Sequence, residues 1–230
     1  MKIFGMQKLT LIDYPGKVAA TIFLGGCNFR CPFCHNSLLV TDVDGSTATD
    51  SSEIFPLLKK RVGLLDGIVV SGGEPLMQGG IEDFIKEIKD IGYSVKLDTN
   101  GSYPDKLRYL VENKLVDYVA MDIKNSLPNY GETIGIENYD TSKIEESADF
   151  LMNGSCPYEF RTTVVKELHN KKDFDLIGMR FRKAERYYLQ TFQDSGSVIE
   201  SGLHGYNKEE MEEFRQILLK YIKNAQLREI

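Results

Sequence analysis

Six short apolar runs that alternate with helical patterns constrain the fold of this 230-residue chain more than any other feature. The runs are rich in β-branched residues, which is typical of strands covered on both faces. They lie at residues 18–24, 67–72, 94–100, 117–124, 159–165 and 186–192. Because strands alternating with helices form parallel sheets through right-handed crossovers, the pattern predicts an α/β fold.

Four other segments place apolar residues at the spacing of one helical face. They lie at residues 79–92, 102–114, 141–154 and 207–225, and Ser102 is in a position to cap the second. We attribute these apolar stripes to ordinary core packing. An open doubly wound sheet and a partial (β/α)6 barrel both fit the order of elements. In both folds, functional loops lie at the carboxyl ends of the parallel strands.

Composition and charge restrict the compartment and the classes of partner that we expect for this protein. The formal net charge is −6, whereas a general nucleic-acid scaffold usually has a basic surplus. No apolar run approaches the roughly 18 residues of a membrane span, and the N-terminus has no signal-peptide pattern. We therefore expect a cytoplasmic protein without membrane or general nucleic-acid partners. In that compartment its four cysteines are expected to be ligands or reactive groups rather than disulfides.

Short motifs with polar or glycine residues lie at or just after the carboxyl ends of the predicted strands. They are "SGGEP" at 71–75, "DTNG" at 98–101, "MDIK" at 121–124, "RTTVV" at 161–165 and "LQTF" at 189–192. Taken singly, such motifs are explained by turns, helix caps or loop charges. Because the carboxyl ends of parallel strands converge on one mouth, their joint occurrence indicates a single functional site there.

Three of the four cysteines follow the first predicted strand, within "GGCNFRCPFCHN". Cys27, Cys31 and Cys34 could bind zinc with His35, although the adjacent Cys34 and His35 can hardly reach one tetrahedral ion without strain. With Cys156 they could supply the four thiolates of an electron-transfer cluster. However, Cys156 precedes the fifth strand, so we expect a structural thiol at the opposite end of the sheet. The third alternative is a [4Fe–4S] cluster with three cysteine ligands and one open iron, as a catalytic metal requires.

The C-x3-C-x2-C motif, with the aromatic Phe33 before its last cysteine, resembles the signature of the radical S-adenosylmethionine superfamily. "GGEP" resembles the superfamily's motif for the methionine amino group. "CHN", "DTNG" and "MDIK" resemble the branch that activates glycyl radical enzymes, and the chain is most similar to anaerobic ribonucleoside-triphosphate reductase activating proteins. The resemblance implies a partial (β/α)6 barrel in which residues 1–230 form one domain, with a short N-terminal extension at 1–16 and a C-terminal helix at 207–225.

The resemblance also implies how the cofactors are held. Cys27, Cys31 and Cys34 would ligate three irons of one [4Fe–4S] cluster, and S-adenosylmethionine would chelate the fourth. Residues expected to contact S-adenosylmethionine are Phe33, Gly72, Gly73, Glu74, Asp98, Asp122, Lys124, Thr163 and Gln190. His204 is expected in a surface loop.

Two further assignments concern the rim of the predicted mouth. Asp98, Thr99 and Asp122 match a monovalent-cation site of the activating branch, and a cation between two carboxylates would relieve their repulsion. His35 and Asn36 are expected to brace the cysteine loop or to shape the substrate entrance.

The implied activity is reductive cleavage of S-adenosylmethionine to a 5′-deoxyadenosyl radical, which abstracts hydrogen from a glycine of a glycyl radical enzyme. Anaerobic ribonucleotide reductase is the expected partner, and a flavodoxin- or ferredoxin-type protein is the expected reductant. One alternative is a radical enzyme that acts on a small molecule, such as a purine-like precursor, or on a peptide. Another is a non-catalytic iron–sulfur electron carrier or zinc module, which would have no need of Lys124 or the "GGEP" loop.

Overall fold

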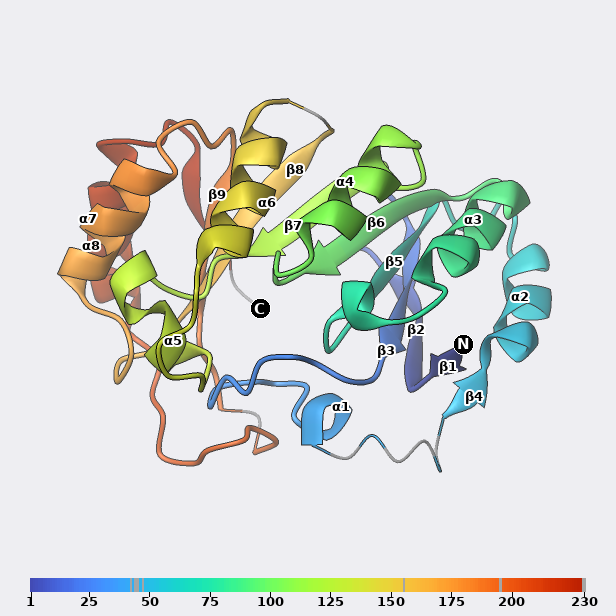
Figure 1. Cartoon of the computed structure of the whole chain (residues 1–230), viewed down its shortest axis with the longest axis horizontal. Helices are drawn as coiled ribbons and strands as arrows, with labels where there is room; N and C mark the ends of the chain where they lie inside the picture. Colours follow the sequence, from blue (N-terminus) through green and yellow to red (C-terminus); the bar gives the residue numbers. More distant parts are fainter. Residues whose placement is uncertain (42, 44–45, 47, 155, 195, 229–230) are drawn as a thin grey trace.

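The computed structural model describes residues 1–41, 43, 46, 48–154, 156–194 and 196–228. Its centre is an eight-stranded sheet in the order β10-β9-β8-β7-β6-β5-β3-β2 (Figure 1). The strands are β2 (Gly5–Thr10), β3 (Ala19–Leu24), β5 (Gly67–Gly72), β6 (Ser94–Thr99), β7 (Tyr118–Asp122), β8 (Tyr158–Val164), β9 (Tyr187–Thr191) and β10 (Ala225–Arg228). β2 pairs antiparallel with β3, and every other pair of neighbours is parallel.

Six helices connect the parallel strands. They are α2 (Ser51–Lys59), α3 (Ile81–Ile91), α4 (Pro104–Glu112), α6 (Ser142–Met152), α7 (Lys171–Arg180) and α8 (Lys208–Leu219). The shorter elements are α1 (Leu38–Thr41), α5 (Tyr130–Thr133), the 3-10 helices η1 (Pro75–Met77) and η2 (Leu127–Asn129), and a small antiparallel sheet of β1 (Lys2–Ile3) and β4 (Thr49–Asp50). Among the described residues, no helix is both long and apolar enough to cross a membrane.

The order of the parallel strands decides between the two α/β architectures. From β3 to β10 the parallel strands lie side by side in chain order, so every crossover proceeds in the same direction. Right-handed crossovers that all proceed one way place their helices on one face, whereas a doubly wound sheet reverses its order and carries helices on both faces. Figure 1 shows the six connecting helices in an arc outside the strands. The predicted partial barrel is therefore confirmed.

The two faces of the sheet differ in character. On the helix side, side chains such as Ile22, Val70 and Leu97 are fully buried and belong to one core with the helices. The inner face holds a separate apolar cluster made of Tyr14, Ala19, Val69 and Tyr118. Closer to the carboxyl ends of the strands, the inner face becomes charged, and this end forms the mouth of the barrel.

The predicted strands correspond to β3 and β5–β9, but both ends of the chain differ from the prediction. Residues 5–10 of the expected N-terminal extension form β2. The helix predicted at 207–225 ends at Leu219, and Ala225 begins β10. The error has a physical cause: Ile222 and Ala225 are buried like the helical stripe before them, but they lie in a loop and a strand. Ser102 does not cap α4, because Tyr103 occupies the cap position.

An ion pair fixes the last strand to the inside of the barrel. The Arg228 guanidinium of β10 donates to both carboxylate oxygens of Glu159 in β8, at 2.6 and 2.9 Å. Glu159 is fully buried and also accepts a hydrogen bond from the Tyr118 hydroxyl at 2.9 Å. Burial would raise the pKa of Glu159, but the hydrogen bonds and charge of Arg228 outweigh it, so the pKa lies below its usual value.

We predict that Arg228→Met lowers the free energy of unfolding by about 3 kcal/mol, because it leaves a buried carboxylate without its cation. Urea denaturation at pH 7 measures this change. The control is Arg182→Met, which removes an exposed arginine and should change stability by less than about 0.5 kcal/mol. If the two variants lose equal stability, β10 is not held by this pair.

Candidate active site

The cysteine loop, residues 25–36, crosses the mouth of the barrel between β3 and α1 (Figure 1). It is anchored to segments from distant parts of the chain. The Arg30 N–H donates to the carbonyl of Ile134 at 2.9 Å, next to α5. On the other side, the Glu200 N–H donates to the carbonyl of Pro32 at 2.9 Å. The loop is therefore held in place by the fold itself.

The loop after β5 packs directly against the backbone of the cysteine loop. Gly73 N–H donates to the carbonyl of Leu24 at 2.9 Å, and Glu74 N–H donates to that of Gly26 at 2.8 Å. A Cβ atom on Gly73 would lie 2.1 Å from the Gly26 oxygen, and Gly72 has a φ of 128°. Only glycine permits both the approach and the dihedral angle. The two glycines of "GGEP" are thus required by the contact between the loops.

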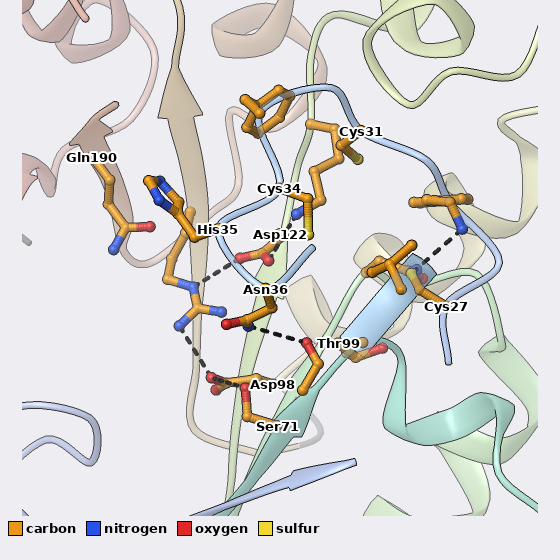
Figure 2. Close-up of a pocket in the computed structure, with 18 residues that line it drawn as sticks. Cys27, Cys31, Cys34, His35, Asn36, Ser71, Asp98, Thr99, Asp122 and Gln190 are labelled. Atoms are coloured by element: carbon orange, nitrogen blue, oxygen red, sulfur yellow. Dashed lines mark hydrogen bonds and ion pairs between the residues drawn. The ribbon is translucent and has the colours of Figure 1, made fainter. Parts of the chain in front are cut away.

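A cavity of about 240 Å³ opens at this contact (Figure 2). It brings together most of the residues that the sequence predicted for one site. Those that line it are Cys27, Cys31, Phe33, Cys34, His35, Asn36, Gly72, Gly73, Asp98, Thr99, Asp122, Lys124 and Gln190. Glu74, Thr163 and His204 are not part of its wall.

The three thiols of the cavity wall are largely removed from solvent. Burial raises the pKa of Cys27 and of Cys34, and it raises the pKa of Cys31 to about 12. The ammonium of Lys124 opposes this effect at all three. A free thiol is therefore the favoured form at neutral pH, and a positively charged group bound in the cavity would favour the thiolates.

The thiols are not arranged around a single point. Within the described part of the chain, no three His, Cys, Asp or Glu side chains are placed to hold one metal ion. A zinc site formed by the three cysteines and His35 therefore has no support. Several irons, each bound by one thiolate, do not require the sulfur atoms to converge, so the donor set fits a cluster.

Cys156 lies apart from the other cysteines. It precedes β8 and does not line the cavity. Burial raises its pKa to about 11, with a further contribution from Asp117, which precedes β7. These neighbours are at the amino ends of the strands, opposite the cysteine loop, as the sequence predicted.

A row of alternating charges crosses the mouth on neighbouring strands. Arg161 of β8 lies between two carboxylates, with Nη1 3.5 Å from Oδ2 of Asp98 and Nε 2.8 Å from Oδ1 of Asp122. Lys96 pairs with the other oxygen of Asp98, and Lys124 Nζ lies 2.9 Å from Oδ2 of Asp122. Asp98 and Asp122 come from the neighbouring strands β6 and β7, and Figure 2 shows both at the cavity. Burial would raise the pKa of Asp122, but Arg161 and Lys124 outweigh it and hold the pKa at about 2.

Lys124 is held from behind by residues that the sequence analysis did not single out. His169 is 2% exposed, and its Nε2 donates to the carbonyl of Lys124 at 2.8 Å. The Lys124 N–H donates to the Tyr130 hydroxyl at 3.4 Å. Arg161 is the first residue of "RTTVV", and period-two alternation from the inward-facing Glu159 directs its side chain into the mouth.

Glu74 connects two strand-end loops behind the cavity. Its carboxylate is fully buried and accepts from Leu76 N–H at 3.0 Å, Thr99 hydroxyl at 2.8 Å and Asn100 N–H at 2.7 Å. Burial raises the pKa of Glu74 to about 7, and these three donors oppose the rise. The side chain therefore couples the "GGEP" loop to the "DTNG" loop rather than facing the cavity.

The remaining predicted residues have clear positions. Asn36 Nδ2 donates to the carbonyl of Gly72 at 3.3 Å, and the His35 ring lies 5.3 Å from the ring of Phe192. These contacts support the bracing role over the entrance role, although both stay predictions.

The last two residues lie outside the cavity wall. Thr163 lies beside Gln190 in the β8–β9 register. His204 is exposed and pairs with Glu167 at 2.8 Å, in a surface loop as expected.

Comparison with known proteins identifies the family. Residues 21–177 match the family model described as the radical SAM superfamily. The chain belongs to the radical SAM superfamily. A Methanocaldococcus jannaschii protein whose name assigns it to the glycyl-radical enzyme activating enzymes is 32% identical over 99% of this chain and 96% of its own length. This likeness places the chain in the activating branch, as its motifs predicted.

One further relative supports this assignment, and a solved structure shares the fold. The pyruvate formate-lyase-activating enzyme of Clostridium pasteurianum is 30% identical, over 54% of this chain and 52% of that enzyme. The crystal structure of a domain of a pyruvate-formate lyase-activating enzyme from Bacteroides vulgatus has a TM-score of 0.58 and 18% identity, over 70% of this chain and 98% of that domain. Membership of the superfamily implies a [4Fe–4S] cluster and S-adenosylmethionine as cofactors.

We predict that Glu74→Gln lowers the free energy of unfolding by about 1–3 kcal/mol, because an amide NH2 must then face one of the three buried donors. Urea denaturation at pH 8 measures the loss. Glu87→Gln, on the exposed surface of α3, is the matched control and should cost less than about 0.5 kcal/mol. Equal losses for the two variants would contradict the coupling role of Glu74.

Glu74→Gln should also change how the free energy of unfolding depends on pH. The folded protein holds a proton on Glu74 up to about pH 7, whereas the unfolded chain loses it near 4.5. The contribution of this group to stability is therefore fully present below 4.5 and is lost as the pH rises through about 7. Glu74→Gln does not titrate, so its stability should fall less steeply across this window.

Proposed function

We propose that this radical SAM enzyme generates a glycyl radical on a partner protein, and that the partner is an anaerobic ribonucleotide reductase. The observation that carries the proposal is the cavity itself, in which three separated thiols face Asp98, Asp122 and Lys124 across the mouth of the barrel. Support for the glycyl radical comes from the activating-enzyme relative that matches 99% of the chain. Support for the reductase comes from the sequence resemblance of the opening and cysteine segments.

We assign the cluster to Cys27, Cys31 and Cys34. With the cofactors bound, these three cysteines would hold a cluster that could supply the one electron needed to cleave the sulfonium and to start hydrogen abstraction from the substrate. Lys124 is the cation for the methionine carboxylate, because His169 fixes its backbone at the cavity edge.

The remaining cofactor contacts follow from the cavity wall. The backbone at Gly72 and Gly73 lines the cavity and offers polar groups for the methionine amino group, with Asn36 bound to the Gly72 carbonyl. Phe33 and Gln190 are assigned to the adenosyl part, because both line the same cavity. Thr163 lies outside the wall, so its assignment depends on the register beside Gln190 alone.

The proposal also includes the protein substrate, the electron donor and the cellular location. The glycine belongs to a loop of a large protein, which must enter the mouth from outside, and a flavodoxin- or ferredoxin-type protein supplies the electron. The cytoplasm is the proposed location, which suits four cysteines that are all free in the structure.

We predict that the anaerobically reconstituted enzyme, given dithionite and S-adenosylmethionine, forms 5′-deoxyadenosine, measured by chromatography. Adding the candidate reductase should produce a glycyl radical signal in EPR. An intact cluster without 5′-deoxyadenosine would refute radical chemistry. Product without a glycyl radical would instead point to a small-molecule or peptide substrate.

Iron content tests the ligand assignment. We predict that Cys27→Ala, Cys31→Ala and Cys34→Ala each reduce bound iron strongly, because each removes one of three thiolates. Cys156→Ser is the matched control, since it removes the thiol outside the cavity and should leave iron content and the cluster absorbance near wild type. A loss of about one iron in four on Cys156→Ser would show that this thiol is a fourth ligand.

A further inference from the structure

The carboxylates expected to hold a monovalent cation already have cationic partners on every oxygen. Oδ1 of Asp98 accepts from Lys96, and its Oδ2 lies 3.5 Å from Arg161. Oδ1 of Asp122 accepts from Arg161 Nε at 2.8 Å, and its Oδ2 accepts from Lys124 at 2.9 Å. A free ion would have to share these oxygens with positively charged donors, which would repel it.

The third expected ligand is also engaged. The hydroxyl of Thr99 donates to Glu74 at 2.8 Å and accepts from the Gly101 N–H at 3.1 Å. Successive side chains of a strand point to opposite faces, so this hydroxyl points away from the carboxylate of Asp98. The hydroxyl is thus engaged with Glu74 and Gly101, although Thr99 itself lines the cavity.

Charge balance leads to the same conclusion. The five groups joined by direct ion pairs are Lys96, Asp98, Arg161, Asp122 and Lys124, with three positive charges against two negative ones. A further cation would increase this surplus, whereas an anion beside Lys124 would cancel it. The row is thus suited to receive a carboxylate rather than an alkali ion.

The Arg161 guanidinium is well placed to act as the cation between Asp98 and Asp122. Arg161 is anchored in the β7–β8 ladder, where its carbonyl accepts from the Ile123 N–H at 2.8 Å. Its side chain is 14% exposed, and its planar fork reaches carboxylates on two neighbouring strands. Ordering such a group costs little on cofactor binding, because it is already held.

We propose that Arg161 is a built-in cation that replaces the monovalent ion between Asp98 and Asp122. By fixing Asp122, it positions Lys124 for the methionine carboxylate, so cofactor binding requires no alkali ion. This inference rests on the proposed function, since it concerns the same cofactor site.

The test compares salts at constant ionic strength. S-Adenosylmethionine binding to the reconstituted enzyme is measured by equilibrium dialysis in tetramethylammonium, sodium or potassium chloride. Wild type should bind equally in all three, within about twofold. Arg161→Ala should bind about tenfold more weakly in tetramethylammonium, and potassium or millimolar guanidinium should restore part of the loss. Arg182→Ala, an exposed arginine, should behave as wild type.

The outcomes separate the inference from the function on which it rests. Tighter, saturable binding by wild type in potassium would overturn the role of Arg161 and leave the cofactor site intact. Failure of wild type to bind S-adenosylmethionine in every salt would overturn the cofactor site itself. If Arg161→Ala does not fold, the comparison of wild-type binding in the three salts still tests whether the site requires an alkali ion. Thermal unfolding of cluster-free protein gives a second readout, in which potassium should stabilise Arg161→Ala but not wild type.

Discussion

Partial burial of two carboxylates on neighbouring strands is the constraint on which the mouth of this barrel depends. Asp98 and Asp122 both line the cavity, where like charges removed from water would repel. Three basic side chains from β6, β8 and the end of β7 compensate them. The same ion pairs join three strand ends, so the charges that compensate the carboxylates also determine the geometry of the site.

The order of the strands makes that solution possible. Because the parallel strands follow chain order, residues at equivalent heights on β6, β7 and β8 become neighbours on one face. Asp98 pairs in register with Ala120, and Asp122 with Arg161. A doubly wound sheet would separate some of these strand ends. The helix side remains apolar, so the charged inner face does not compromise the main core.

Much of this arrangement was predictable from the sequence, because strand runs and strand-end motifs report local patterns. The cysteine loop, "GGEP", "DTNG" and "MDIK" were placed at one mouth by topology alone. Strand β10 was not predictable in this way, since Ile222 and Ala225 continue a helical spacing from a loop and a strand. Nor was His169, whose role depends on tertiary contact with Lys124 across a separation of 45 residues.

The direction of each side chain explains why not every functional group in a motif points into the cavity. In "DTNG", Asp98 faces the charged row, whereas the next hydroxyl, on Thr99, bonds to Glu74 behind the wall. In "GGEP", the glycines let two backbones meet, and the acid after them binds the neighbouring loop. Each motif therefore has one part at the cavity and another that joins it to the adjacent strand end. The second part keeps the first in place, because a loop without such a partner would be free to move away from the thiols that it faces.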